Sequence, residues 1–374
     1  MDHRPRFVID KPRMAAVRSP ADITVVIPSY NHEAFIAEAL PSVLAQTDGA
    51  FLIMVVDDAS PDATAEQALS VQDPRITVRV NPQNVGLGNS IVSVLDAINT
   101  PLTALLNSDD LFHPERLARC RESLLNSPEK QVVATDYSLV DTDGGCLALD
   151  NVSLSRDGSS ICNAVRSLQE ERSKDHGQIT IFHHLLEHNF LATSSNIVCR
   201  TEYLRRRAET LKGLNYCLDW QLFLDASLDE RLTYLRENLL GYRLHSGNTI
   251  WFTNADRSDY YLEANRVAAR ALQRFLFSLA DPQRKGPELE RVLRTVLEQL
   301  AANGIVDGFG LGLSTLFQSE EFEQAGQRNE LMKTLYAMAQ ETPFKRKDWN
   351  GSWVIQTARI IMYLWKKSLH RVPA

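Results

Sequence analysis

The sequence predicts an α/β protein, in which a mostly parallel sheet flanked by helices is followed by an all-helical C-terminal region. From residue 23 onward, short runs of β-branched and aliphatic residues alternate with helical periodicity, and tight joints separate them. After about residue 256 only helical periodicity remains. We therefore divide the 374 residues into an N-terminal extension (1–21), a sheet domain (22–255) and a helical domain (256–374).

The strands predicted for the sheet domain are apolar runs that stop at proline or at acidic residues. Runs of this kind are typical of parallel strands covered by helices on both faces. In chain order we expect strand 23–28, helix 33–46, strand 51–56, helix 63–70, strand 76–80, helix 89–98 and strand 102–106, and later strands 131–135 and 232–240. Residues 142–178 are rich in Ser, Asp, Asn and Gly and predict a long loop.

Composition and charge exclude several classes of protein. Hydrophobic residues make up 44% and charged residues 23%, which is an ordinary globular balance. The net charge of −7 argues against a nucleic-acid-binding protein. No apolar run approaches the roughly 20 residues of a membrane span, and residues 1–20 are too charged for a signal peptide. The five cysteines have no CxxC spacing, so we expect reduced thiols in a cytoplasmic protein.

Polar residues follow three of the predicted strands, at the point where each strand ends. The three segments are Pro28-Ser29-Tyr30-Asn31, Asp57-Asp58-Ala59-Ser60 and Asn107-Ser108-Asp109-Asp110. Ligands of open parallel sheets bind beyond the carboxyl ends of the strands. Four carboxylates at one such edge predict a compensating cation with oxygen ligands, Mn²⁺ or Mg²⁺. Helix capping is the alternative for either pair of acids taken alone.

These segments, in this order and spacing, resemble the inverting family-2 nucleotide-sugar glycosyltransferases of the GT-A fold, over roughly residues 22–250. The resemblance implies a binding site for a nucleoside-diphosphate sugar, most simply a UDP-sugar. The donor-binding residues that it implies are Pro28, Tyr30, Asn31, Asp57, Asp58, Gly86, Asn89, Asn107, Ser108, Asp109 and Arg243. Asp58 would accept a hydrogen bond from the base, because a uracil imide offers a donor and a carboxylate can only accept.

The resemblance also implies a metal site of the DXD-like kind. Asp109, Asp110 and His245 would hold Mn²⁺ or Mg²⁺, with Asp110 as the more direct ligand. Asn107 departs from the family pattern, because many members carry Asp at this position. An asparagine keeps an oxygen acceptor but loses a charge, which weakens the case for strict metal dependence.

Residues 215–223 resemble the segment of the family that carries the catalytic base. Asp219 would take the proton of the acceptor hydroxyl, and Trp220 would form an apolar platform for the acceptor. Leu218 stands where the family usually has Glu, which is a second departure. The alternative is an acid at the start of a helix, with Trp220 in the core.

Two further segments border the expected donor site. Gly86-Leu87-Gly88-Asn89 lacks the third glycine of a dinucleotide fingerprint, so we reject NAD binding; a tight turn before a helix is the alternative to a donor contact. Residues 241–248 resemble a family segment in which Arg243 would stabilise the departing diphosphate. His245 would contact metal or phosphate there, or serve as a structural histidine.

The C-terminal segment 345–374 carries seven Lys or Arg residues and one acid, Asp348. Its apolar stripe and its tryptophans are typical of a helix on an anionic membrane surface, on the inner face of the membrane. The alternative is a helix packed on the catalytic domain.

We therefore predict an inverting, metal-dependent glycosyltransferase that acts on a carbohydrate or lipid-linked acceptor in polysaccharide or glycolipid biosynthesis. A sugar-nucleotide nucleotidyltransferase is the alternative among enzymes, but residues 29–33 have no Gly-rich, basic loop of that class. A non-catalytic module that binds nucleotide sugars is the second alternative, and the departures at Asn107 and Leu218 keep it open.

Overall fold

The structure is a computed structural model that describes residues 21–47, 49–147, 189–245, 247 and 248, and isolated residues at 181–185 and 259–274. The chain divides into two compact units, Met1–Glu263 and Ala264–Ala374, and the sheet and the site lie in the first. Most of the predicted loop 142–178 and the whole basic segment 345–374 lie outside the described residues. The domain boundaries at 21/22 and 255/256 stay predictions.

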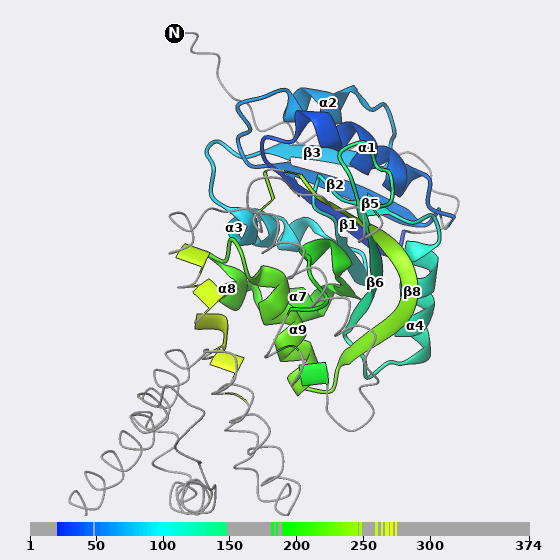
Figure 1. Cartoon of the computed structure of the whole chain (residues 1–374), viewed down its shortest axis with the longest axis vertical. Helices are drawn as coiled ribbons and strands as arrows, with labels where there is room; N and C mark the ends of the chain where they lie inside the picture. Colours follow the sequence, from blue (N-terminus) through cyan, green and yellow to red (C-terminus); the bar gives the residue numbers. More distant parts are fainter. Residues whose placement is uncertain are drawn as a thin grey trace, which may run out of the picture. The chain divides into compact units, whose positions relative to one another are not determined.

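The first unit is built on one mixed sheet of eight strands in the order β3-β2-β1-β4-β7-β6-β8-β5 (Figure 1). Its strands are β1 (Ile23–Ser29), β2 (Phe51–Asp57), β3 (Ile76–Val80), β4 (Leu102–Leu105), β5 (Leu111–Phe112), β6 (Val132–Val140), β7 (Val198–Arg200) and β8 (Leu232–Arg243). The four strands β1 to β4 are parallel to one another, as the alternation of apolar runs and helices predicts. The prediction of a mostly parallel sheet flanked by helices is confirmed.

Helices lie on both faces of the sheet. They are α1 (Glu33–Leu44), α2 (Thr64–Ser70), α3 (Leu87–Val92), α4 (Arg116–Asn126), α7 (Thr201–Arg205), α8 (Ala208–Leu211) and α9 (Leu218–Leu228), with short 3-10 turns η1 (Leu95–Ala97) and η3 (Ser194–Asn196). Helices α1 and α2 lie on one side of β1–β3, and α3 lies on the other (Figure 1). Every residue of β1 is buried, because helices cover the strand from both sides.

The second half of the sheet departs from the parallel pattern. β7 pairs antiparallel with both β4 and β6, and β6 pairs parallel with β8 across a long separation in sequence. β7 was not predicted, because three residues are too few for a period to be recognised. The predicted helix 89–98 was wrong in extent, since α3 ends at Val92 and η1 follows separately. Within the described residues, no helix combines the length and the apolar composition of a membrane span.

Candidate active site

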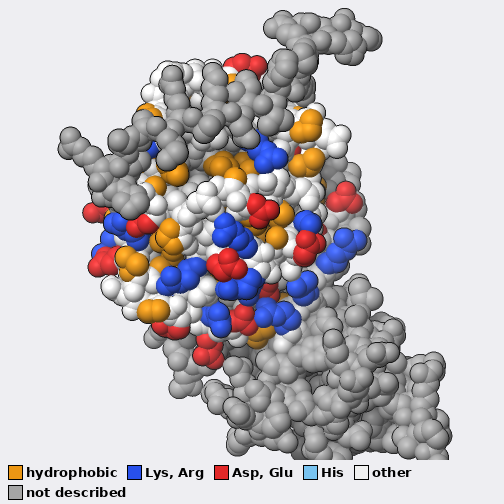
Figure 2. Space-filling view, turned by 180° about the vertical axis from the view of Figure 1, so that it is seen from behind, with side chains coloured by type: hydrophobic (Ala, Val, Ile, Leu, Met, Phe, Trp, Pro, Cys, Tyr) orange, Lys and Arg blue, Asp and Glu red, His pale blue; other side chains and the backbone are white. Residues whose placement is uncertain are grey.

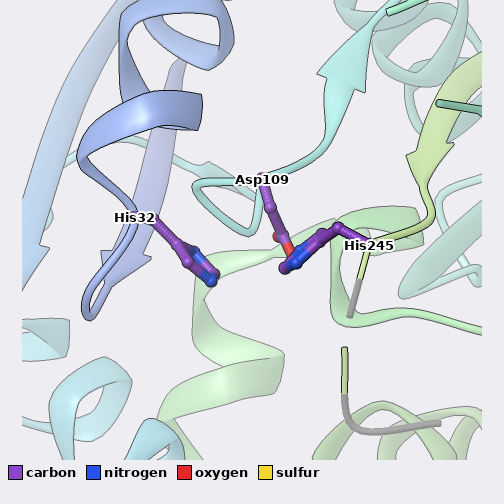
Figure 3. A group of neighbouring side chains, drawn as sticks. All are labelled: His32, Asp109 and His245. Carbon is purple, nitrogen blue, oxygen red and sulfur yellow. The ribbon is translucent and has the colours of Figure 1, made fainter. Parts of the chain in front are cut away.

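The sheet reverses its strand order at β1, which has β2 on one side and β4 on the other. Such a reversal opens a crevice beyond the carboxyl ends of the strands. The loops after β1 and β4 place His32 and Asp109 in this crevice, and the chain beyond β8 adds His245 (Figure 3). One ligand atom from each of the three side chains lies within 4.8 Å of the others.

Asp109 is the centre of this group. Its Oδ2 lies 3.0 Å from Nε2 of His245 and 3.4 Å from the amide nitrogen of Asn248. Its Oδ1 is buried and has no hydrogen-bond partner within the part of the chain that the structure describes. Burial alone would raise the pKa of Asp109, but the hydrogen bond from His245 and the two imidazoles lower it below its usual range. The carboxylate is therefore ionised, with one oxygen available to a cation.

His32 faces Asp109 from the loop before α1. Its Nδ1 lies 2.8 Å from the hydroxyl of Ser108, the residue that precedes Asp109. Burial lowers the pKa of His32, against the opposing effect of the Asp109 charge, so the neutral imidazole is favoured. No sequence motif singled out His32; its role depends on a contact between loops 76 residues apart.

Asp110 is turned away from this group, so the geometry does not support the prediction that it is the more direct metal ligand. Its carboxylate accepts hydrogen bonds from the hydroxyls of Ser195 (2.5 Å) and Thr193 (3.2 Å) and from the backbone N–H of Arg243 (2.9 Å). Burial and the neighbouring charge of Asp109 raise the pKa of Asp110 to about 8. Asp110 joins three segments of the chain and has little free capacity for a cation.

Arg243 also differs from its predicted role. The side chain is fully buried, and its guanidinium donates to Glu38 (2.7 Å) and to the backbone carbonyls of Asp109 (2.7 Å), Asp141 (3.1 Å) and Thr142 (2.6 Å). A guanidinium has only five N–H donors, and these contacts occupy most of them. Arg243 therefore holds the loops around Asp109 together through hydrogen bonds to their backbone. The prediction that it faces the diphosphate is not supported by this geometry.

Asp219 lies in the first turn of α9, and only 6% of its surface is exposed. Asn189 donates a hydrogen bond to its Oδ2 over 2.8 Å. Burial raises the pKa of Asp219 to about 7, although the hydrogen bond from Asn189 opposes the shift. A carboxylate with a pKa near 7 can accept a proton at neutral pH, as the predicted base requires.

Trp220 is not placed as an acceptor platform. Its side chain is buried, and its indole N–H donates to the backbone carbonyl of Leu185 over 2.5 Å. The core position that was the alternative for this tryptophan is the one that the structure shows.

A polar segment at 189–196 connects Asp219 to the Asn107–Asp110 loop. Asn189 binds Asp219, whereas Thr193 and Ser195 bind Asp110. Asn107, the departure from the family pattern, donates to Thr193 over 2.8 Å and accepts from Ser194 over 2.6 Å. No motif in the sequence predicted this segment; the signal that it carries is a run of four polar residues, 193–196, between apolar neighbours.

Tyr242 provides an independent indication that the acids face one region. Burial and the charges of Asp110, Asp109 and Asp219 raise its pKa well above the usual value. The three carboxylates are therefore near enough to this tyrosine of β8 to affect its ionisation. The structure thus brings together the predicted metal-binding and catalytic acids.

The two acids at the end of β2, Asp57 and Asp58, accept hydrogen bonds from neighbouring loops. Asp58 accepts hydrogen bonds from the side chain of Asn81 (2.8 Å) and from the backbone N–H groups of Val85 and Gly86 (2.8 Å for Gly86). Asp57 accepts from both the backbone N–H and the hydroxyl of Ser60. Three donors occupy the Asp58 carboxylate, and neither acid caps a helix, because the N-caps of α2 and α3 have no side-chain cap hydrogen bond; both acids hold loops instead.

The glycine loop before α3 packs closely on the segment that leads to Asp219. A Cβ on Gly88 would lie 2.1 Å from the carbonyl oxygen of Leu211, and one on Gly86, whose φ is +87°, would lie 2.1 Å from Oδ1 of Asn215. Asn89 donates to Val85 O and accepts from Gly213 N–H. The predicted turn and the close packing against residues 211–215 therefore together explain why glycine occupies positions 86 and 88.

The remaining predicted donor residues lie at the end of β1. Pro28 is buried within the strand, Tyr30 is 46% exposed, and Asn31 has a positive φ of 56° while its N–H donates to Ser60. Tyr30 is thus the side chain of this loop that is free to cover a planar ligand. Ser108 is buried and holds His32.

Glu263 positions the start of α9 and was not predicted. Its carboxylate accepts hydrogen bonds from three successive backbone N–H groups, those of Asn215 (2.9 Å), Tyr216 (2.8 Å) and Cys217 (2.6 Å). The contact spans nearly fifty residues, so no local pattern could indicate it.

Comparison with known proteins agrees with this architecture. Residues 24–145 match the family model described as glycosyl transferase family 2. The chain is 31% identical to the succinoglycan biosynthesis protein ExoO of Rhizobium meliloti over 134 residues, which are 36% of this chain and 38% of that protein. It is 30% identical to the uncharacterized glycosyltransferase alr2836 of Nostoc sp. over 239 residues, 60% of this chain and 66% of that protein.

Among solved structures, the crystal structure of S. aureus TarS 1–349 in complex with UDP-GlcNAc superposes with a TM-score of 0.53 and 16% identity. The match covers 92% of this chain and 88% of that one, and it shows a shared fold. The chain spans between 14% and 66% of the length of the first four curated relatives. By the matching family model and these relatives, residues 24–145 of this chain belong to glycosyltransferase family 2.

Proposed function

We propose that this chain is an inverting, metal-dependent glycosyltransferase that moves a sugar from a nucleoside-diphosphate donor, a UDP-sugar, to a hydroxyl group of a carbohydrate or lipid-linked acceptor. One observation carries the proposal: the segment 189–196 binds the buried carboxyl group of Asp219 through Asn189 and binds Asp110, the neighbour of Asp109, through Thr193 and Ser195. The family, the name of the R. meliloti relative and the nucleotide sugar bound to TarS support sugar transfer and polysaccharide synthesis.

The residues at the crevice fit a divalent cation. Asp109 offers an ionised carboxylate whose Oδ1 is buried without a partner among the described residues, and His245 adds an imidazole. Mn²⁺ or Mg²⁺ bound there would neutralise the negative charge that develops on the departing diphosphate. Asp110 and Arg243 would serve this site indirectly, because they fix the loops that carry Asp109.

Asp219 would act on the acceptor. As the acceptor oxygen bonds to the anomeric carbon, the bond from that carbon to the diphosphate oxygen breaks, and the hydroxyl proton passes to a carboxylate oxygen of Asp219. Attack on the face opposite the leaving group inverts the anomeric configuration. Asn189 holds Oδ2, so the orientation of the carboxylate does not depend on the substrate.

Two measurements test this proposal. In a thermal-shift panel of nucleoside diphosphates and their sugars with Mn²⁺, UDP at 100 times its dissociation constant should add about 2.7 kcal/mol of stability. UDP release from UDP-sugars should then be abolished in Asp219→Asn, while UDP binding stays within about threefold, because Asp219 faces the acceptor. Binding without turnover in the wild type would favour the non-catalytic module, and no response to any nucleotide would contradict the proposal.

A further inference from the structure

We infer that His32 is a third ligand of the cation, so that the site is a His–Asp–His site that selects Mn²⁺ over Mg²⁺. The inference builds on the proposed metal site at Asp109 and His245 and adds a residue that no motif indicated. It predicts which metal the protein prefers.

The orientation of the His32 ring leaves one nitrogen for a cation. Nδ1 is occupied by the hydroxyl of Ser108 at 2.8 Å, so Nε2 is the nitrogen that remains available. Metal-binding histidines characteristically donate their second ring N–H to an oxygen partner, which fixes both the tautomer and the ring plane. Ser108 supplies this partner to His32, and it is adjacent in the sequence to Asp109.

The two imidazoles pack against each other and against Phe35. The rings of His32 and His245 lie edge to face with 5.6 Å between their centroids, and Phe35 lies 5.7 Å from His32 and 4.5 Å from His245. The side chains of both histidines point toward Asp109 (Figure 3). The first turn of α1 therefore holds the imidazoles on either side of one carboxylate.

Asp109 itself offers an oxygen to a cation. The side chain is more than nine-tenths buried, and Oδ1 has no hydrogen-bond donor within the described ranges. Leaving a buried acceptor unpaired costs about 1–3 kcal/mol, and more when the acceptor is charged. A cation between the two imidazoles and the carboxylate would remove this cost.

The donor set decides the selectivity. Imidazole nitrogens suit transition metals, whereas Mg²⁺ prefers carboxylate, carbonyl and water oxygens. A site with two imidazoles and one carboxylate thus favours Mn²⁺ over Mg²⁺, whereas the oxygen-only pair Asp109 and Asp110 would not discriminate in this way. The N–H of Gly247 donates to Nδ1 of His245, so Nε2 is the nitrogen that faces Asp109.

The test is a titration with Mn²⁺ alone, followed through the electron paramagnetic resonance signal of free Mn²⁺, with Mg²⁺ as competitor. His32→Gln keeps a polar side chain that can bond to Ser108 but lacks the imidazole. We expect it to weaken Mn²⁺ binding at least tenfold and to change Mg²⁺ binding less than twofold. The matched control is His113→Gln, because His113 is an exposed histidine of the same unit, and it should change neither affinity.

Electron spin echo modulation adds a readout that does not depend on affinity. The wild type should show two coupled imidazole nitrogens on Mn²⁺, and His32→Gln should show one. If His32→Gln does not fold, Ser108→Ala keeps both histidines and should weaken Mn²⁺ binding severalfold. Wild-type affinity in His32→Gln, one nitrogen in the wild type, or no Mn²⁺ binding at all overturns the inference. UDP binding and UDP release are measured separately, so the proposed function can survive that result.

Discussion

Asp219→Asn should make the protein inactive and, at alkaline pH, more stable. Asp219 is buried at the start of α9, and burial raises its pKa to about 7 from an ordinary value of 3.8. Asparagine has nearly the same shape and still accepts the hydrogen bond from Asn189, but it carries no charge to bury. The substitution therefore removes the cost of ionising a buried group while it removes the base.

The magnitude follows from the two pKa values. A carboxyl whose pKa is higher in the folded than in the unfolded state binds more protons when folded, so stability falls as pH rises from 3.8 to about 7. Well above pH 7 the free energy of unfolding has fallen by its full amount, about 4 kcal/mol, because each unit of difference between the two pKa values is worth about 1.36 kcal/mol. At pH 5 only about 1.5 kcal/mol has been lost. The difference in free energy of unfolding between Asp219→Asn and the wild type should thus grow by roughly 2–3 kcal/mol between pH 5 and pH 8.5.

Thermal unfolding at pH 5 and pH 8.5 measures this difference. A unit of this size shifts its midpoint by about 2–4 °C per kcal/mol, so the gain over wild type should increase by roughly 5–10 °C between the two pH values. Asp96→Asn, at an exposed position of η1, is the control and should show no pH-dependent gain. A variant that is equally or less stable than wild type at both pH values would refute the reasoning, because Asp219 would then carry no burial cost.

Three other substitutions test the positioning of the site. Gly88→Ala should lower the melting temperature by more than 5 °C or prevent soluble expression, because its Cβ would meet two carbonyl oxygens; Gly49→Ala has open space and should melt like wild type. Glu263→Ala leaves three backbone N–H groups without their carboxylate and should cost roughly 3 kcal/mol of stability in denaturant titration. Arg243→Lys keeps the charge but loses most of the hydrogen bonds from the guanidinium to the carbonyls of Asp109, Asp141 and Thr142, so it should cost roughly 1–3 kcal/mol and leave UDP affinity of the folded protein within about threefold. Selective loss of UDP binding at an unchanged melting temperature would instead support the prediction that Arg243 contacts the diphosphate of the donor.

The sequence predicted the edge of the sheet that carries the site, because strand ends are encoded locally. β1, β2 and β4 are apolar runs ended by polar residues, and parallel strands bring such ends to one edge. Within each loop, however, the direction of a side chain depends on what packs against it. Asp109 and Asp110 are neighbours of the same residue type, yet one faces the crevice and the other faces residues 193–195.

Long-range contacts account for most of what the sequence could not predict. His32 is positioned by a hydrogen bond with Ser108, and Asp219 by one from Asn189. Glu263 binds the backbone just before α9, the helix that carries Asp219. Each of these contacts joins segments 30 to 76 residues apart, and hydrophobic periodicity, which is a local pattern, cannot predict such pairings. Arg243 follows the same rule, because its guanidinium donates to Glu38 of α1, which is 205 residues away in the sequence.

The most direct test of the central claim is the anomeric configuration of the product. A UDP-α-sugar is incubated with the protein and Mn²⁺, water serves as the acceptor, and the released sugar is followed by proton NMR before it mutarotates. Inverting transfer with Asp219 as the base predicts that the β-anomer forms first and that Asp219→Asn forms none. Initial release of the α-anomer, or equal rates in the wild type and the variant, would contradict the account.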